Sequence, residues 1–250
     1  MARRGLLYLL GIIVAALAAV EIYTRLPTGL AEPLNLKPDE TRQVVLIFHG
    51  SLAGGDPILD DIANRFVELA ALDSGTVVVN YRWDDGADQR LRAAASGRRL
   101  GTALGTELGS LPKLESVRII THSVGAFVAD ALCESLREKR STPWIEMTFL
   151  DPFGILGFID WRFGVRNHGH CADFAVAFIN RDDATAASNS PLAQAYNRDV
   201  TASPRRELFL RSGHYWPLRY YADFIDLAEV TPGIRTHDDY PRGDLRTLTD

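Results

Sequence analysis

The stretch "SVRIITHSVGAFVADALCESLREK", residues 116–139, joins two structural patterns at a single serine. Its first part is an apolar run rich in β-branched residues, which predicts a buried strand. Its second part, residues 126–139, predicts a helix. Ser123 lies at the turn between the two. A buried strand that passes directly into a helix is typical of α/β proteins with a parallel sheet.

The rest of the chain alternates between the same two patterns. Further strands are predicted over residues 42–50, 75–83, 144–154, 171–183 and 206–216. Further helices are predicted over residues 57–72, 87–111 and 218–230, and glycines at four-residue spacing are expected to break the second of them. We expect these glycines to pack closely on the sheet. Apolar strands separated by helices predict an α/β fold, with a mostly parallel central sheet and helices on both of its faces.

Length and composition indicate one large globular domain, and the net charge argues against nucleic acid as a partner. The 250 residues are 46% hydrophobic, which suits one large globular domain. The net charge of −5 gives no electrostatic basis for binding nucleic acid. Cys133 and Cys171 lie far apart in the sequence and lack the spacing of a zinc site, and the pattern leaves their redox state open.

The first 25 residues, "MARRGLLYLLGIIVAALAAVEIYTR", differ from the rest of the chain. Two arginines precede an apolar run over residues 6–20, which predicts an N-terminal hydrophobic helix. The run is shorter than the ~20 residues of a comfortable membrane span, and a small-x-small step offers a cleavage site, so a cleaved signal peptide and an uncleaved anchor both fit. Either one places the folded domain on the non-cytoplasmic side, as a membrane-anchored or secreted protein.

Four segments follow from these patterns. Residues 1–25 are the signal peptide or membrane anchor, and the proline-containing residues 26–42 are a linker. Residues 43–232 form the α/β domain, and residues 233–250 are expected to be a loose polar tail.

Ser123 has two interpretations. In the first it only caps the following helix. In the second it is a nucleophile on a tight strand-to-helix turn, because "THSVG" resembles the G-x-S-x-G pattern with Thr121 in place of the first glycine. Gly125 keeps the turn free of clashes, and the carboxyl ends of parallel strands are where α/β sheets bind ligands.

A nucleophilic serine requires a base and an acid that orients the base. His214 is the best candidate base, because it follows the strand predicted over residues 206–216. The acid is Asp151, after the strand that ends in "FLDPFG", or Asp182 or Asp183, after the next strand. A carboxylate in an apolar setting such as that of Asp151 needs a partner, and a histidine N–H supplies one.

The other histidines are weaker candidates. We expect His122 to point to the opposite side of its strand and His237 to be solvated in the tail. His168, His170 and Cys171 resemble a metal-binding cluster, but a fourth ligand at suitable spacing is missing, so no metal or cofactor is predicted.

An oxyanion hole needs two backbone N–H groups. One is that of Val124, directly after the candidate nucleophile, and the other is that of Ser51 in the loop "HGSLAGG" after the first strand. The glycines of this loop allow it to bend close to the site.

The ordered set "LIFHG", "VVVNYRW", "THSVGAFVAD", "FLDPFG", "ADFAVAFINRDD" and "GHYWPLRYY" resembles the α/β-hydrolase superfamily. Within it, the chain resembles the pancreatic-lipase-like branch of lipases and phospholipases A1, over about residues 44–221. The resemblance implies a triad of Ser123, Asp151 and His214, with the N–H groups of Ser51 and Val124 as the oxyanion hole. The chain departs from that branch at Thr121 and in a reduced lid region, residues 184–205.

Motifs and resemblance together predict a lipase- or esterase-like hydrolase that cleaves carboxylic esters through an acyl-enzyme, without a cofactor. Its partners are then an ester or acyl-lipid substrate and, through the N-terminal segment, a membrane. Two alternatives stand beside this prediction: a membrane-tethered, non-catalytic binding protein of the same fold, and a hydrolase of thioesters or amides.

Overall fold

A seven-stranded sheet forms the centre of the computed structural model, which describes residues 2–70, 75–182, 184–225 and 231–249, without the side chains of residues 2–4. Every strand pairs in parallel with its neighbours, in the order β2-β1-β3-β4-β5-β6-β7. The strands are β1 Gln43–Phe48, β2 Thr76–Tyr81, β3 Ser116–His122, β4 Trp144–Leu150, β5 Phe174–Ile179, β6 Tyr196–Asp199 and β7 Leu245–Thr247. The α/β class predicted from the sequence is confirmed.

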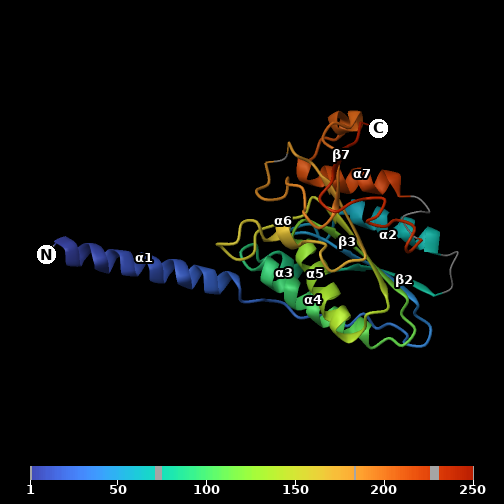
Figure 1. Ribbon diagram of the computed structural model, residues 1–250, viewed down its shortest axis with the longest axis horizontal. Helices are drawn as coiled ribbons and strands as arrows, with labels where there is room; N and C mark the ends of the chain where they lie inside the picture. The colour runs from blue at the N-terminus through green and yellow to red at the C-terminus, as the bar shows by residue number, and fades with distance from the viewer. Residues whose placement is uncertain (1, 71–74, 183, 226–230, 250) are drawn as a thin grey trace.

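Helices lie on both faces of this sheet, with α4 and α5 on one side and α2 and α7 on the other (Figure 1). The α-helices are α1 Ala2–Thr24, α2 Pro57–Ala70, α3 Asp84–Ala87, α4 Ala93–Gly109, α5 Ala126–Lys139, α6 Phe163–Asn167 and α7 Trp216–Phe224. The described residues also form the short 3₁₀ helices η1 Ser123–Gly125, η2 Pro204–Leu208 and η3 Gly213–Tyr215.

The strands are apolar throughout because both faces of the sheet are buried. In β1, Val44 and Leu46 contribute to the core beneath α4 and α5. Their neighbours Val45 and Ile47 contribute to the core beneath α2 and α7. Successive side chains of a strand point to opposite faces, so a strand covered on both sides loses the alternation of polar and apolar residues.

Helix α4 is continuous, so the break expected at its glycines is wrong. Close packing is confirmed, but against α5 rather than against the sheet. A Cβ atom on Gly101 would lie 2.2 Å from the carbonyl oxygen of Val128, and one on Gly105 would lie 2.3 Å from that of Leu132. The glycines therefore let two helix backbones approach closely. A disulfide between Cys133 and Cys171 joins α5 to the segment before β5 and settles the redox state that the sequence left open.

The strand predicted over residues 206–216 is wrong. The sixth strand is Tyr196–Asp199, which pairs with β5 and so occupies the edge that a strand at residues 206–216 would need. Residues 204–208 form η2, and Leu208 and Leu210 point into solvent. Strand β6 is short and rich in polar residues, so its sequence carries little hydrophobic pattern from which to predict it.

The tail is more ordered than predicted. Its residues Leu245–Thr247 form β7, the last strand of the sheet. His237, expected to be solvated, is half-buried, and its Nε2 accepts a hydrogen bond of 3.1 Å from the backbone N–H of Ala175.

Helix α1 projects from the domain (Figure 1). Its window Gly5–Thr24 has a mean hydropathy of 2.4 and no buried share, so it is long and apolar enough to cross a membrane. N-terminal signal sequences pass the same test, and the helix fits either a signal anchor or a membrane span.

Replacement of Gly101 tests the helix–helix contact. Gly101→Ala should lower the free energy of unfolding by at least about 2 kcal/mol, because the new methyl group would collide with the α5 backbone. Urea denaturation followed by circular dichroism measures this change. Gly55→Ala is the matched control, since a Cβ there meets open space. Equal stability of the two variants would contradict the packing described.

Candidate active site

The loops that follow the carboxyl ends of β1, β3, β4 and β5 meet at one edge of the sheet. They carry Ser51, Ser123, Asp151 and Asn180 respectively. Parallel strands bring segments that are distant in the sequence together at this edge, which is where α/β sheets bind their ligands.

Ser123 occupies a strained turn between β3 and η1. Its φ angle is +54°, a left-handed conformation that costs a residue with a side chain about 1–3 kcal/mol. Small neighbours make room for it: a Cβ on Gly50 would lie 2.7 Å from the Cβ of Ser123, and one on Gly125 would lie 3.1 Å from the carbonyl oxygen of His49. The turn leads directly into α5, with Val124 at the start of the helical segment, where N–H groups lack intrahelical acceptors.

Asp151 and His214 are hydrogen-bonded to each other. The Nδ1 of His214 lies 2.6 Å from the Oδ2 of Asp151. The carboxylate is fully buried, and its Oδ1 accepts a second hydrogen bond, of 3.0 Å, from the backbone N–H of Asn180. Burial of an ionised carboxylate is costly unless it is hydrogen-bonded, and both oxygens of this one have a donor.

The alternative acids are placed differently. Asp182 is about half exposed, and its Oδ1 lies 3.7 Å from a guanidinium nitrogen of Arg206. Asp183 lies outside the described residues. Of the three acids that the sequence left open, Asp151 is the one that the structure places on His214.

His214 lies in η3 rather than at the end of a strand. The Ser212 hydroxyl accepts a hydrogen bond from the His214 backbone N–H, and the Asn180 side chain donates one of 3.1 Å to the Gly213 carbonyl. A Cβ on Gly213 would lie 2.5 Å from the amide nitrogen of Asn180. A tight turn anchored by Asn180 therefore positions His214, in place of the strand predicted from the sequence.

His122 does not point away from the site, contrary to expectation. Its Nε2 donates a hydrogen bond of 3.1 Å to the His214 carbonyl oxygen, and the two rings lie 4.6 Å apart. Burial, and secondarily the nearby His214, hold the pKa of His122 well below the usual value of 6.5. A neutral ring at this place supports the η3 turn without adding positive charge beside His214.

The loop after β1 is fixed against the end of β2. The Nε2 of His49 accepts a hydrogen bond of 3.0 Å from the Trp83 backbone N–H, and the Trp83 indole donates one of 2.9 Å to the His49 carbonyl. The Ser51 hydroxyl donates to the carbonyl oxygen of Ala87. These contacts fix the loop that carries Ser51, whose neighbour Gly50 closely approaches Ser123.

Residues of the cluster that resembles a metal site in the sequence have other partners. Cys171 is in the disulfide, and the ring nitrogens of His168 contact the Oδ2 of Asp130 at 2.6 Å and the carbonyl oxygen of Phe153 at 3.0 Å. Within the described part of the chain, no group of three His, Cys, Asp or Glu side chains is arranged to hold a metal ion.

The buried pair of Asp130 and His168 is a positioning element that the sequence analysis missed. His168 bonds the Phe153 carbonyl, and the backbone N–H of Phe153 donates a hydrogen bond of 3.1 Å to the carbonyl oxygen of Ser123. A signal for it was present in the sequence, because an aspartate within the apolar helix "AFVADAL" needs a buried partner.

No protein-family model matches this sequence, and neither does any curated protein. We therefore infer the function of this chain from the geometry of the site.

Removal of the Asp151 carboxylate, but not of the Asp182 carboxylate, should change the proton NMR signal of the His214 ring. The Nδ1 proton shared with Asp151 should give a strongly downfield-shifted proton NMR signal, because a short charge-assisted hydrogen bond deshields it. Asp151→Asn should remove or move this signal, and Asp182→Asn should leave it in place. Loss of the signal in Asp182→Asn alone would contradict the assignment of the acid.

Burial of His122 predicts a pH dependence of stability. Because its pKa is lowered in the folded state, the unfolded chain binds more protons below pH ~6.5, so stability is fully present above that pH and falls as the pH decreases. His122→Gln should reduce this slope by up to about 1.4 kcal/mol per pH unit. Denaturation at pH 5 to 8 measures it, with the exposed His170→Gln as control; equal slopes in both variants would contradict a buried neutral His122.

Proposed function

We propose that this chain is a serine hydrolase of carboxylic esters. The observation that carries the proposal is the buried hydrogen bond between Asp151 and His214, located at the sheet edge where Ser123 occupies a positive-φ turn. His122, which precedes Ser123, donates a hydrogen bond to the His214 carbonyl, so the oriented histidine and the serine on its strained strand-to-helix turn share one end of the sheet. Nucleophilic acyl transfer requires a serine and a base in such an arrangement.

In the proposed reaction, the Ser123 hydroxyl oxygen attacks the ester carbonyl carbon while Nε2 of His214 takes the hydroxyl proton. Asp151 keeps the other ring proton on Nδ1, which leaves Nε2 as the basic nitrogen, and it stabilises the imidazolium that forms. The tetrahedral intermediate expels the alcohol, which receives the proton from His214. Water then attacks the acyl-serine in the same way and releases the carboxylic acid.

The N–H groups of Ser51 and Val124 are the proposed donors to the oxyanion. Contact between Gly50 and Ser123 supports this role for the loop after β1, and the start of α5 supports it for Val124. Loss of one such donor typically raises the barrier by about 3–4 kcal/mol.

The position of the acid is consistent with the resemblance to pancreatic-lipase-like enzymes. Asp151 follows β4, the strand next to the one that leads to Ser123, as the resemblance implies, rather than β5. We therefore keep a lipase- or esterase-like member of the α/β-hydrolase superfamily as the proposed family.

The disulfide and the N-terminal helix support a location outside the cytoplasm. Disulfides persist in oxidising compartments, and the Cys133–Cys171 bridge joins two elements of the folded domain. The arginines in the first turn of α1, ahead of its apolar span Gly5–Thr24, support export with the N-terminus on the cytoplasmic side.

Hydrolysis of p-nitrophenyl esters of increasing acyl length tests the proposal on the full chain in detergent. Ser123→Ala and Asp151→Asn should each lower kcat/KM by at least about a thousandfold, because the residues of a triad act as a unit. Ser110→Ala and Asp182→Asn, at exposed sites, are the matched controls.

A folded wild-type protein that hydrolyses none of these esters would contradict the proposal and would favour a non-catalytic binding protein. Cleavage of thioesters or amides in place of oxygen esters would keep the nucleophile and change the substrate class.

A further inference from the structure

Seven large apolar side chains in the loops around the candidate active site are exposed to solvent. We call this set the apolar rim; it consists of Leu52, Leu91, Phe158, Ile159, Trp161, Leu208 and Leu210. Leu52 follows β1, Leu91 follows β2, and the others follow β4 and β6. All of these loops start at strand carboxyl ends, so the rim lies on the edge of the sheet that carries Ser123.

The exposure of the rim is unusual for its side chains. Leu210 is 96% exposed and Trp161 is 59% exposed. Single apolar residues on a surface need no explanation, but a group gathered around one site marks a contact with another molecule or a membrane.

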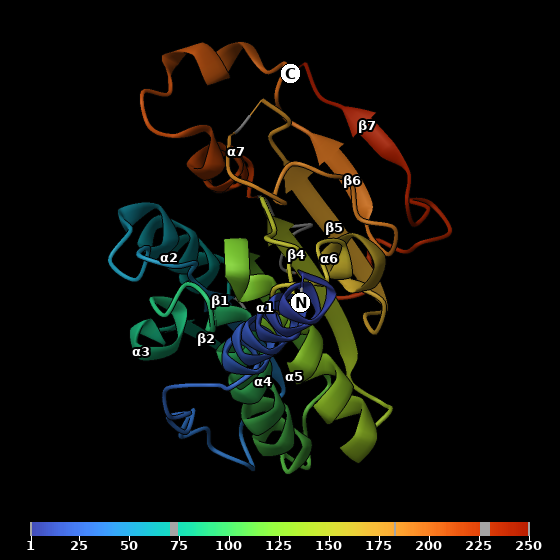
Figure 2. The ribbon, with the colours of Figure 1, turned by 90° about the vertical axis from the view of Figure 1, so that its left-hand side faces the viewer.

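The base of α1 is attached to the same edge. The carboxylate of Glu21 accepts a hydrogen bond of 2.6 Å from the backbone N–H of Phe158, a rim residue. Arg92, next to the rim residue Leu91, donates to the Leu26 carbonyl at 2.6 Å and lies over the Tyr23 ring at 5.1 Å. Figure 2, which looks along α1, shows the helix projecting from the domain towards the viewer.

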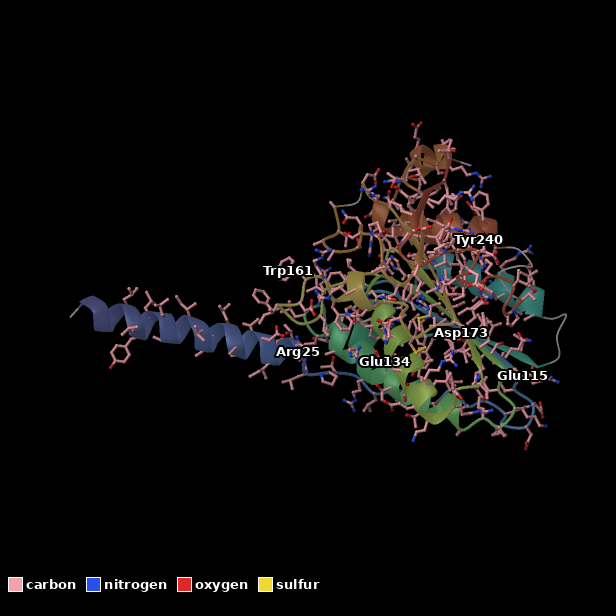
Figure 3. All side chains as sticks on the ribbon, viewed as in Figure 1. Arg25, Glu115, Glu134, Trp161, Asp173 and Tyr240 are labelled. Carbon is pink, nitrogen blue, oxygen red and sulfur yellow. A yellow bond between two sulfur atoms is a disulfide. The ribbon has the colours of Figure 1, made fainter. Side chains whose placement is uncertain are left out.

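The other views also show α1 leaving the domain on the side where loops of the rim lie. The loops after β4 and β6 lie on the side of the domain from which α1 leaves (Figure 1). Trp161 and Arg25 lie on this side as well (Figure 3). The apolar residues 5–20 are all exposed, and burial begins at Glu21 and Thr24, so a bilayer around the apolar part of α1 would begin where the rim begins.

We propose that the apolar rim rests in the interface of the bilayer that α1 spans, so that the candidate active site faces the membrane. This membrane contact does not rest on the proposed hydrolase function. Tryptophan and phenylalanine are favoured at this depth, with the indole N–H near the lipid headgroups.

Charges near the rim indicate that binding depends on apolar insertion rather than on anionic lipid. Charges of both signs are exposed there: the basic residues are Arg90, Arg162, Arg205 and Arg211, and the acidic residues are Asp84, Asp85, Asp88 and Glu207. We therefore expect the contact to form on zwitterionic phosphatidylcholine and to be insensitive to salt.

Quenching by nitroxide lipids tests the contact without requiring activity. The two native cysteines are disulfide-bonded, so Trp161→Cys and Leu210→Cys each introduce one reactive thiol for a fluorescent label. The full chain is reconstituted into phosphatidylcholine vesicles with nitroxides on the acyl chains. Val67→Cys is the control, because Val67 is 53% exposed in the last turn of α2, near the opposite edge of the sheet.

Strong quenching of both rim labels, with little quenching of the Val67 control, is the expected result. Equal quenching at all three positions would overturn the membrane contact. Rim labels protected from both nitroxide lipid and aqueous iodide would also overturn it, because they would indicate a second protein copy on the rim.

Discussion

The arrangement of the turns at the carboxyl edge of this sheet depends on the buried carboxylate of Asp151. A buried ionised carboxylate without partners is strongly destabilising, and here one oxygen accepts the Asn180 N–H while the other is 2.6 Å from Nδ1 of His214. This hydrogen bond joins the end of β4 to the turn before α7. The Asn180 side chain braces the same turn through the Gly213 carbonyl, and His122 braces it from β3. Three neighbouring strands thus fix one imidazole.

Backbone strain is concentrated at the same place. Five residues other than glycine have positive φ angles in the described part of the chain, and three of them are Leu52, Ser123 and Asp151, each at the first or second turn after a strand. Such conformations persist only where the surrounding structure over-determines them. Here the surroundings are the close approach of Gly50 to Ser123 and the chain of contacts from Asp130 through His168 and Phe153 to Ser123. These strained conformations lower the stability of the fold, and three of the five lie at the carboxyl edge of the sheet.

The sequence predicted what depends on continuous hydrophobic runs and local turns. The strands β1 to β5 and the helices α2, α5 and α7 lie where their patterns indicated, and Asp151 meets His214 as one of the stated alternatives. What it missed depends on tertiary contacts. Strand β6 is short and polar in sequence, and β7 is a short, exposed strand at the edge of the sheet, so both lack a hydrophobic period. The leucines of residues 206–210 give this segment the hydrophobic pattern of a strand, but their side chains are exposed and belong to the apolar rim. The direction of His122 is set by the His214 carbonyl, which is distant in the sequence.

We propose that Ser123 is the reactive group of this edge, and peptide mapping after reaction with a fluorophosphonate tests this role most directly. The reagent phosphonylates a serine only where a neighbouring base and oxyanion donors activate it. We expect one adduct, on the peptide that contains Ser123, and no adduct on Ser123→Ala. An adduct on another serine, or no adduct on the folded wild-type protein, would contradict this role.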